Sequence, residues 1–178
     1  CLLNLSKAIL NEANLIKVRL NTANLSKANL RGANLSKANL SLVDLSGANL
    51  SEANLRGANL QGAILGKANL SKADIGKADL RGALLIKTKV NRAIISGCRI
   101  YGASVWDLKG KILEQKDLVI VPNDKPLLTV DDINIAQFVY LLVENKKIRN
   151  VIDTLTAKSV LILGRFSKER KEVLDNLR

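Results

Sequence analysis

Aliphatic residues recur at every fifth position through the first hundred or so residues of the chain. The positions divisible by five hold Leu, Ile or Val from Leu5 to Val105 without exception. A small residue, mostly alanine, lies two positions before each of them, and Asn or Asp commonly lies between the two. A period of five fits neither an α-helix, which repeats every ~3.6 residues, nor a strand, which repeats every two. The pattern therefore predicts a repeat architecture.

Four such units make a coil of twenty residues that can be square in section. Each side of the coil then points one Leu and one Ala inward, and coils stack at a strand spacing of about 4.8 Å, so that Leu lies over Leu. The interior is narrow, so the second inward residue must be small, because a packed core tolerates neither voids nor overfilling. The polar residues between the inward positions turn the corners, where short polar side chains bond to the backbone.

The units A-N-L-S-K and A-N-L-R-G, as at 28–32, 33–37 and 53–57, closely resemble the pentapeptide-repeat family. The resemblance covers residues 1–105 and implies a mainly β fold, a right-handed quadrilateral β-helix of about five coils. A leucine-rich repeat fits poorly, because its period is longer. We expect a small α/β segment to follow this solenoid.

Several outward positions that should be polar are apolar instead. They are Ile9, Ile16, Leu42, Ile64, Leu84, Ile86 and Ile94. At twenty residues per coil, Ile64 and Leu84 stack on one wall, and Ile86 lies around the adjacent corner, which predicts an interaction patch. Packing of the chain's own C-terminal segment on this patch is the simpler interpretation, and a contact between two copies is the alternative.

The basic character of the chain lies in the repeat. Residues 1–105 carry 15 Lys and Arg against five Asp and Glu, a net charge of +10, and residues 106–178 carry 13 against 11, a net charge of +2. Some pentapeptide-repeat proteins inhibit topoisomerases by imitating DNA, which requires an acidic rod, so the positive charge argues against that role. The aromatic residues lie at or beyond the end of the repeat, so at most weak, salt-sensitive, non-specific binding to nucleic acid is expected.

The residues needed for most catalytic and metal sites are missing. The chain has no histidine, which removes the Ser-His-Asp and Cys-His arrangements. Its two cysteines, Cys1 and Cys98, form neither a disulfide framework nor a metal site, and Cys98 occupies an inward slot as a buried substitute for alanine. We therefore predict no catalytic, metal or cofactor residues and no enzymatic activity. Nothing resembles a signal peptide or a membrane span, so a cytoplasmic location and no membrane partner are expected.

The composition changes after Val105, and two further regions are predicted. Residues 106–128 form a β capping segment and a linker, in which Trp106 plugs the open end of the rod. Residues 129–178 are a helical segment followed by the strand and helix that start an α/β domain. Thr129 and Asp132 resemble a capping box at a helix start. The apolar stretch 133–143 must be buried, and the helices of 133–155 are expected to join copies into a homo-oligomer.

The apolar run 159–164 ends in glycine and precedes an amphipathic helix, which is typical of the opening of a β-α-β unit. The stretch V-L-I-L-G-R-F-S-K-E-R-K at 160–171 resembles the start of a TIR-like, predicted nucleotide-binding domain in bacterial fusions with pentapeptide repeats. This resemblance implies that the chain is truncated early in that domain. The turn that contains Gly164, Arg165, Ser167 and Lys168 is a candidate anion site, although an ordinary strand-to-helix turn explains it as well.

Three functions follow, and a non-catalytic scaffold for protein–protein contact or oligomerisation is the leading one, because a rod with a continuous core is rigid. The alternative is the N-terminal part of a TIR-like nucleotide-binding signalling or effector protein. Nucleic-acid binding through the lysines of the rod is the third.

Overall fold

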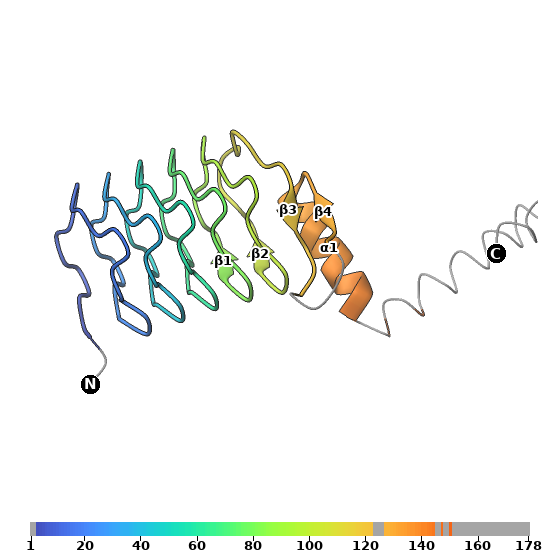
Figure 1. Cartoon of the computed structure of the whole chain (residues 1–178), viewed down its shortest axis with the longest axis horizontal. Helices are drawn as coiled ribbons and strands as arrows, with labels where there is room; N and C mark the ends of the chain where they lie inside the picture. Colours follow the sequence, from blue (N-terminus) through green and yellow to red (C-terminus); the bar gives the residue numbers. More distant parts are fainter. Residues whose placement is uncertain (1–2, 123–126, 145–146, 148–149, 151–178) are drawn as a thin grey trace, which may run out of the picture. The chain divides into compact units, whose positions relative to one another are not determined.

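The computed structural model describes residues 3–122, 127–144, 147 and 150. Contacts divide the chain into two units, Cys1–Tyr140 and Leu141–Arg178, and the first carries all that follows. Figure 1 shows the described part of the repeat as coils stacked side by side. On each of the four walls, parallel bridges join residues that lie 20 apart, such as Asn4 with Asn24 and Asn14 with Asn34. The predicted coil of four units is therefore confirmed.

Each corner is a tight turn with one left-handed residue. In the first unit described, the Ala8 N–H donates to the Leu5 carbonyl at 3.0 Å, and Lys7 between them has a φ of 60°. The same position has positive φ in unit after unit, mostly in residues other than glycine, which adopt this conformation only at a cost. Where Asn or Asp precedes the corner, its side chain can hold the turn, as where Asn24 Oδ1 accepts from the Ser26 N–H at 2.9 Å.

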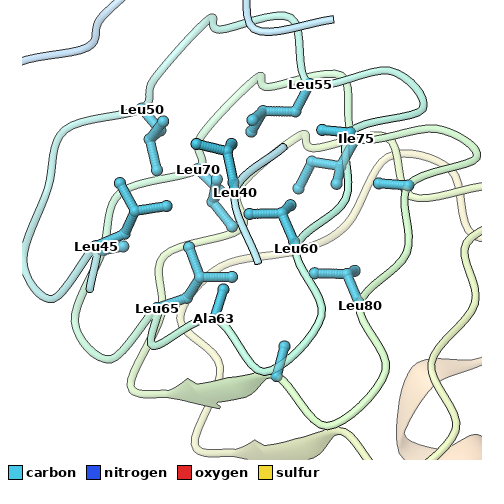
Figure 2. Close-up of a cluster of buried hydrophobic side chains, with 14 of the residues drawn as sticks. Leu40, Leu45, Leu50, Leu55, Leu60, Ala63, Leu65, Leu70, Ile75 and Leu80 are labelled. Atoms are coloured by element: carbon cyan, nitrogen blue, oxygen red, sulfur yellow. The ribbon is translucent and has the colours of Figure 1, made fainter. Parts of the chain in front are cut away.

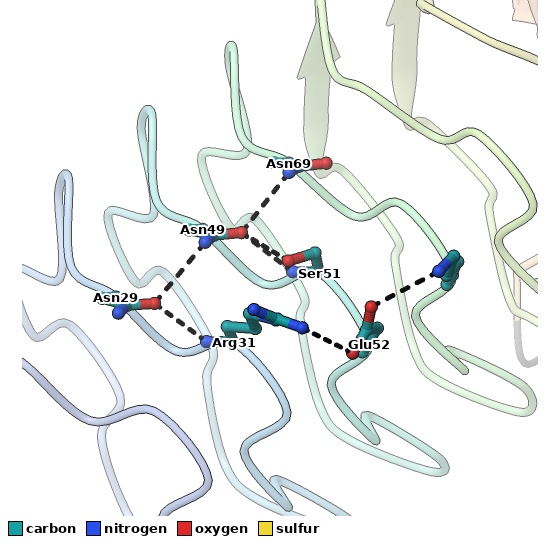
Figure 3. Close-up of polar contacts among 7 residues, drawn as sticks. Asn29, Arg31, Asn49, Ser51, Glu52 and Asn69 are labelled. Atoms are coloured by element: carbon teal, nitrogen blue, oxygen red, sulfur yellow. Dashed lines mark hydrogen bonds and ion pairs between the residues drawn. The ribbon is translucent and has the colours of Figure 1, made fainter.

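The inward residues form one dry core along the rod. Leu25 to Leu70, counted in steps of five, are fully buried, as are the alanines between them. Figure 2 shows the four columns, for example Leu40, Leu60 and Leu80 on one wall. Outside the core, the amide of Asn49 lies between those of Asn29 and Asn69, with hydrogen bonds of 3.5 and 3.4 Å (Figure 3). Leu and Asn thus both stack on themselves, because the coil contains a whole number of units.

The backbone ladder continues beyond the residues that carry the repeat. The five coils expected over 1–105 are followed by a sixth turn, in which Lys109, Glu114 and Val119 bridge to residues 20 earlier. Strands β1 (Leu84–Ile86) and β2 (Ser104–Trp106) pair in parallel on one wall. The short antiparallel strands β3 (Leu118–Val119) and β4 (Thr129–Val130) end the ladder, and α1 (Ile133–Glu144) follows.

The end of the rod is closed by helix α1, which corrects the expectation for Trp106. Trp106 follows the inward residue Val105, so its side chain points outward and is 55% exposed. Ile133 and Ala136 of α1 are instead buried in the core cluster, with Val139 packed against it. The remaining face of α1 is not buried within the described residues, since Ile135 and Phe138 are exposed.

The cap also satisfies backbone N–H groups that the last coil leaves without a further coil to bond. The Val105 N–H donates to Oε1 of Gln137 at 2.6 Å, and the Asp117 N–H donates to Oδ1 of Asp131 at 2.9 Å. The Ile120 N–H donates to the Leu128 carbonyl at 3.1 Å. An exposed strand edge would otherwise pair with another chain, so these contacts terminate the β-helix.

Asp132 alone caps helix α1, which corrects the expected capping box. Its Oδ1 accepts from the N–H groups of Asn134 and Ile135 at 2.8 and 3.1 Å, whereas Thr129 lies three residues earlier in β4. The reason is that the strand pairing of β4 holds Thr129 away from the helix start. Within the part of the chain that the structure describes, no helix is long and apolar enough to cross a bilayer.

Shortening a core leucine should destabilise the rod strongly. Leu60 is fully buried between Leu40 and Leu80, so Leu60→Ala is expected to lower the free energy of unfolding by about 2–5 kcal/mol. Leu42, which is 63% exposed, is the matched control, and Leu42→Ala should change it by less than about 0.5 kcal/mol. Urea unfolding followed by circular dichroism measures both, and equal losses would contradict the described core.

Removing the side chain that bonds the rod edge should loosen the cap. Gln137→Ala leaves the N–H of the buried Val105 without its acceptor, which is expected to cost about 1–3 kcal/mol. Asn134→Ala, at an exposed position on the same helix, is the control. Hydrogen exchange should show faster exchange at Val105 in the first variant alone, and unchanged protection there would refute the bond.

Candidate functional site

The predicted patch lies on one wall of the rod and is larger than the sequence indicated. Ile64 bridges to Leu84, and Ile86 of β1 pairs with Trp106 of β2. All four side chains are exposed, by 40%, 37%, 42% and 55% in that order. We call this set, Ile64, Leu84, Ile86 and Trp106, the apolar face. Sequence reasoning assigned Trp106 to the open end of the rod, although its position one residue after an inward slot placed it beside Ile86.

The apolar face coincides with a local change in the backbone. At residues 86–87 and 106–107 the usual hydrogen-bonded turn gives way to an extended strand and a bend, which produces β1 and β2. Thr88 occupies the inward slot there in place of alanine, is fully buried, and donates its hydroxyl to the Leu65 carbonyl at 2.8 Å. The larger inward side chain accompanies the wider corner. The result is a short flat strand pair that presents three of the four apolar residues.

Lysines line one border of the apolar face. Lys67 and Lys87 occupy the corner column that follows Gly66 and Ile86 in the chain, and both are exposed. Neither forms an ion pair with a described residue, whereas Asp107, the next residue of that column, is paired with Lys109. The hydrogen bond from Lys109 holds the pKa of Asp107 below its usual value. The charge of Lys87 contributes more weakly to the same lowering of the Asp107 pKa. Lys67 and Lys87 are thus two exposed cations that form no ion pair with a described residue.

Some cations elsewhere on the rod are paired with acids, either on a neighbouring coil or on the same one. Arg31 and Lys72 both approach Glu52, at 3.4 and 3.5 Å, and Arg31 first and then Lys72 lower its pKa (Figure 3). Burial by itself raises the pKa of Asp79, but hydrogen bonds from Arg81 outweigh it and hold the value low. The second lysine column, Lys17, Lys37 and Lys77, also has no ion pair with the described residues, and Ile16 is the exposed large apolar residue beside it.

A second feature, which the sequence analysis missed, is an open groove of about 750 Å³ over another corner. Its floor is a column of glycines, Gly62, Gly82 and Gly102, and Tyr101 and Tyr140 lie at one end with their rings edge to face, 5.1 Å apart. A Cβ at Gly102 would lie in ordinary van der Waals contact with Tyr140, at 3.8 Å, so the ring of this helix α1 residue packs directly over the glycine. The sequence signal that could have indicated this groove is the recurrence of glycine every twenty residues from Gly62 to Gly102. We assign the groove to the docking of α1.

The described residues contain no cluster of side chains suited to metal binding. No group of three or more His, Cys, Asp or Glu side chains that could hold a metal occurs among them. Cys98 is fully buried as expected, its Sγ donates to the Ile75 carbonyl at 3.1 Å, and burial raises its pKa to about 12. This thiol remains protonated and inaccessible. The candidate anion turn with Gly164, Arg165, Ser167 and Lys168 lies outside the described residues, as do the linker at 123–126 and the strand at 159–164.

The comparisons with known proteins agree with the repeat. The family model for pentapeptide repeats matches in eight copies, over residues 3–26, 23–62, 38–76 and 63–100, which together span more than half of the chain. A comparison with curated proteins gave no match.

Solved structures of the same kind are also similar. A pentapeptide repeat protein from the Arabidopsis thaliana thylakoid lumen is 29% identical, with 78% of this chain and 73% of that chain covered and a TM-score of 0.47. HetL, a protein involved in heterocyst differentiation regulation in the cyanobacterium Nostoc, is 33% identical, with 70% and 68% covered and a TM-score of 0.24. QnrB1, a plasmid-mediated fluoroquinolone resistance protein, is 17% identical, with 64% and 67% covered and a TM-score of 0.36.

The fold of this family is the right-handed quadrilateral β-helix, with square coils of the kind seen here. The expected fold class is thereby confirmed for the repeat region, whereas the α/β segment falls on residues outside the description. On the match of the eight repeat copies, the chain belongs to the pentapeptide-repeat family.

Proposed function

We propose that this chain is a non-catalytic scaffold whose apolar face binds a protein partner. The observation that carries the proposal is the exposure of four large apolar side chains on one flat wall of a rigid rod. Contiguous apolar surface of this kind marks interaction sites in soluble proteins. Within the described residues nothing covers it, so the expected packing of the chain's own C-terminal segment is not seen there. Tryptophan is also the residue most enriched among those that dominate binding energy.

The rod suits this role because its outer walls are held by a continuous core. Leu65 and Leu85, which lie directly behind Ile64, Leu84 and Ile86, are buried at 0% and 3% exposure. A partner therefore meets side chains on a preformed wall and loses little free energy in ordering it.

Replacing the two apolar residues of the paired strands should abolish binding without unfolding the rod. Because Ile86 and Trp106 are exposed, we expect Ile86→Ser/Trp106→Ser to change the free energy of unfolding by less than about 0.5 kcal/mol per site. The test captures proteins from an extract of the source organism with the wild type and with this variant. Leu42→Ser, which removes an exposed leucine from another corner, is the control.

A band captured by the wild type and the control but lost in the double variant would support the proposal. Identical captured proteins in all three samples would contradict it. Circular dichroism and thermal unfolding establish that each variant is folded.

We also infer that α1 takes part in self-association, as the sequence indicated for 133–155. Ile135 and Phe138, one helical turn apart, are 54% and 58% exposed on α1, while Ile133 and Ala136 face the rod. An apolar pair on an outer helix face supports a contact between helices of two copies.

Substitution of this pair should therefore dissociate the oligomer. Sedimentation velocity of the wild type is expected to show a concentration-dependent dimer or larger species, and Ile135→Ser/Phe138→Ser should sediment as a monomer. Asn134→Ala, on the exposed side of the same helix, should behave as the wild type. A wild type that stays monomeric at all concentrations would refute the inference.

The two remaining hypotheses rest on the sequence. The TIR-like alternative depends on 160–171 and predicts further β-α units after Arg178 in the parent reading frame. Nucleic-acid binding has the two lysine columns as its support, and it predicts an affinity for duplex DNA that falls steeply as salt rises. We place both after the scaffold, because the apolar face is a feature of the described structure that neither of them requires.

A further inference from the structure

We propose that the apolar face binds an acidic amphipathic segment of a partner protein, with apolar side chains seated on the face and carboxylates paired with Lys67 and Lys87. This inference rests on the proposed scaffold function and names the chemistry of its partner. Three observations carry it: the lysine border, a glycine within the face, and the distribution of charge around the face.

The lysine border places two like charges next to each other at fixed positions. Lys67 and Lys87 are 20 residues apart, so they stand on successive coils about 4.8 Å apart in backbone spacing. Both hold positive φ, at 58° and 56°, so the corner fixes where each side chain leaves the rod. Neither has an ion pair among the described residues. Their mutual repulsion is relieved when carboxylates of a partner bind between them.

Gly66 is a position without a side chain inside the apolar face. Its φ is not positive, and a Cβ there would make an ordinary contact with its nearest neighbour, the Ile86 carbonyl oxygen, at 3.8 Å. The equivalent residues of earlier coils are Ser6, Ser26 and Ser46, so the fold does not require glycine at 66. The missing side chain leaves a seat for a side chain of the partner beside Ile64 and Ile86.

The cations that have no ion pair with a described residue lie on one side of the face. At the opposite corner, beyond Ile64 and Leu84, the column with Gly62 and Gly82 is uncharged, and Arg81 is paired with Asp79. A segment with one apolar and one acidic edge matches this arrangement. A second copy of the chain would bring its own lysines to the contact, which its net charge of +12 opposes. Binding to an anionic bilayer would require the apolar side chains to extend further from the rod than the lysines do. The apolar side chains and the lysines start from the same wall, so this condition is not met.

The test selects binders from a display library of short random peptides, with the full chain as bait at low salt. We expect the selected peptides to combine Asp or Glu with large apolar residues. A synthetic copy of the most enriched peptide should bind the wild type, and Lys67→Gln/Lys87→Gln should weaken binding by up to about tenfold. Gly66→Leu should also weaken it, because leucine fills the seat.

A matched control exists on the second lysine column. Lys17→Gln/Lys37→Gln removes two cations from successive coils at the same corner position, away from the apolar face, and should change the affinity less than about twofold. Circular dichroism of all variants shows whether they fold. Added salt should weaken binding to the wild type and have less effect on the Lys67→Gln/Lys87→Gln variant.

The outcomes separate the two proposals. If Ile86→Ser/Trp106→Ser abolishes peptide binding but the Lys67→Gln/Lys87→Gln variant binds as the wild type does, the acidic partner is wrong and the scaffold function stands. If neither variant matters, or no peptide is enriched, both are wrong. Two further results would overturn the acidic partner: face-dependent binding to vesicles that contain phosphatidylserine without any preference for acidic peptides, and a dimer that Gly66→Leu dissociates.

Discussion

The stacking of each coil on the next is the interaction on which the rest of this structure depends. A coil of twenty residues contains four whole units, so the backbone bridges, the leucines and the asparagines all repeat in register. This register has a cost at the corners, where fifteen residues other than glycine hold positive φ. Each such residue is less stable than in an ordinary conformation by about 1 kcal/mol. The buried leucine columns and the inter-coil hydrogen bonds offset that cost, because every coil contributes them again.

A stack of identical coils could be extended by further coils without limit. The last coil ends the stack because its sequence departs from the repeat. Gly110 stands in a slot that is aliphatic elsewhere, and Gln115 stands in another. Gln115 accepts from the Ile133 N–H and donates to Asp132, which fixes the start of α1 over the open end. Gln137 and Asp131 then take the N–H groups that a further coil would have bonded. Polar residues at the end of an apolar column thus convert an extendable edge into a closed one.

The apolar face arises where the outward positions and the corner change together. Thr88 replaces alanine inside the rod, the turn at 86–87 opens into a strand, and Ile86 and Trp106 appear on the outside. Ile86 and Trp106 do not strengthen the core, since both side chains remain exposed on a wall that is already packed behind them. A rigid solenoid can therefore vary one wall for recognition while the other three keep the fold, because each wall is held by its own ladder.

The sequence by itself determined the coil, its square section and its buried columns, because inward positions are set by a local period that tertiary contacts cannot shift without unpacking every coil. It also located Ile64, Leu84 and Ile86 on the surface, and Cys98 in the core, by counting. Only the tertiary structure decided how the rod ends. The side chain of Trp106 lies on the outer surface, Asp132 rather than Thr129 caps α1, and Tyr140 packs against Tyr101 at the corner with Gly102. These features follow from which hydrogen bonds and inward slots the last coil leaves unfilled, and no local period encodes that requirement.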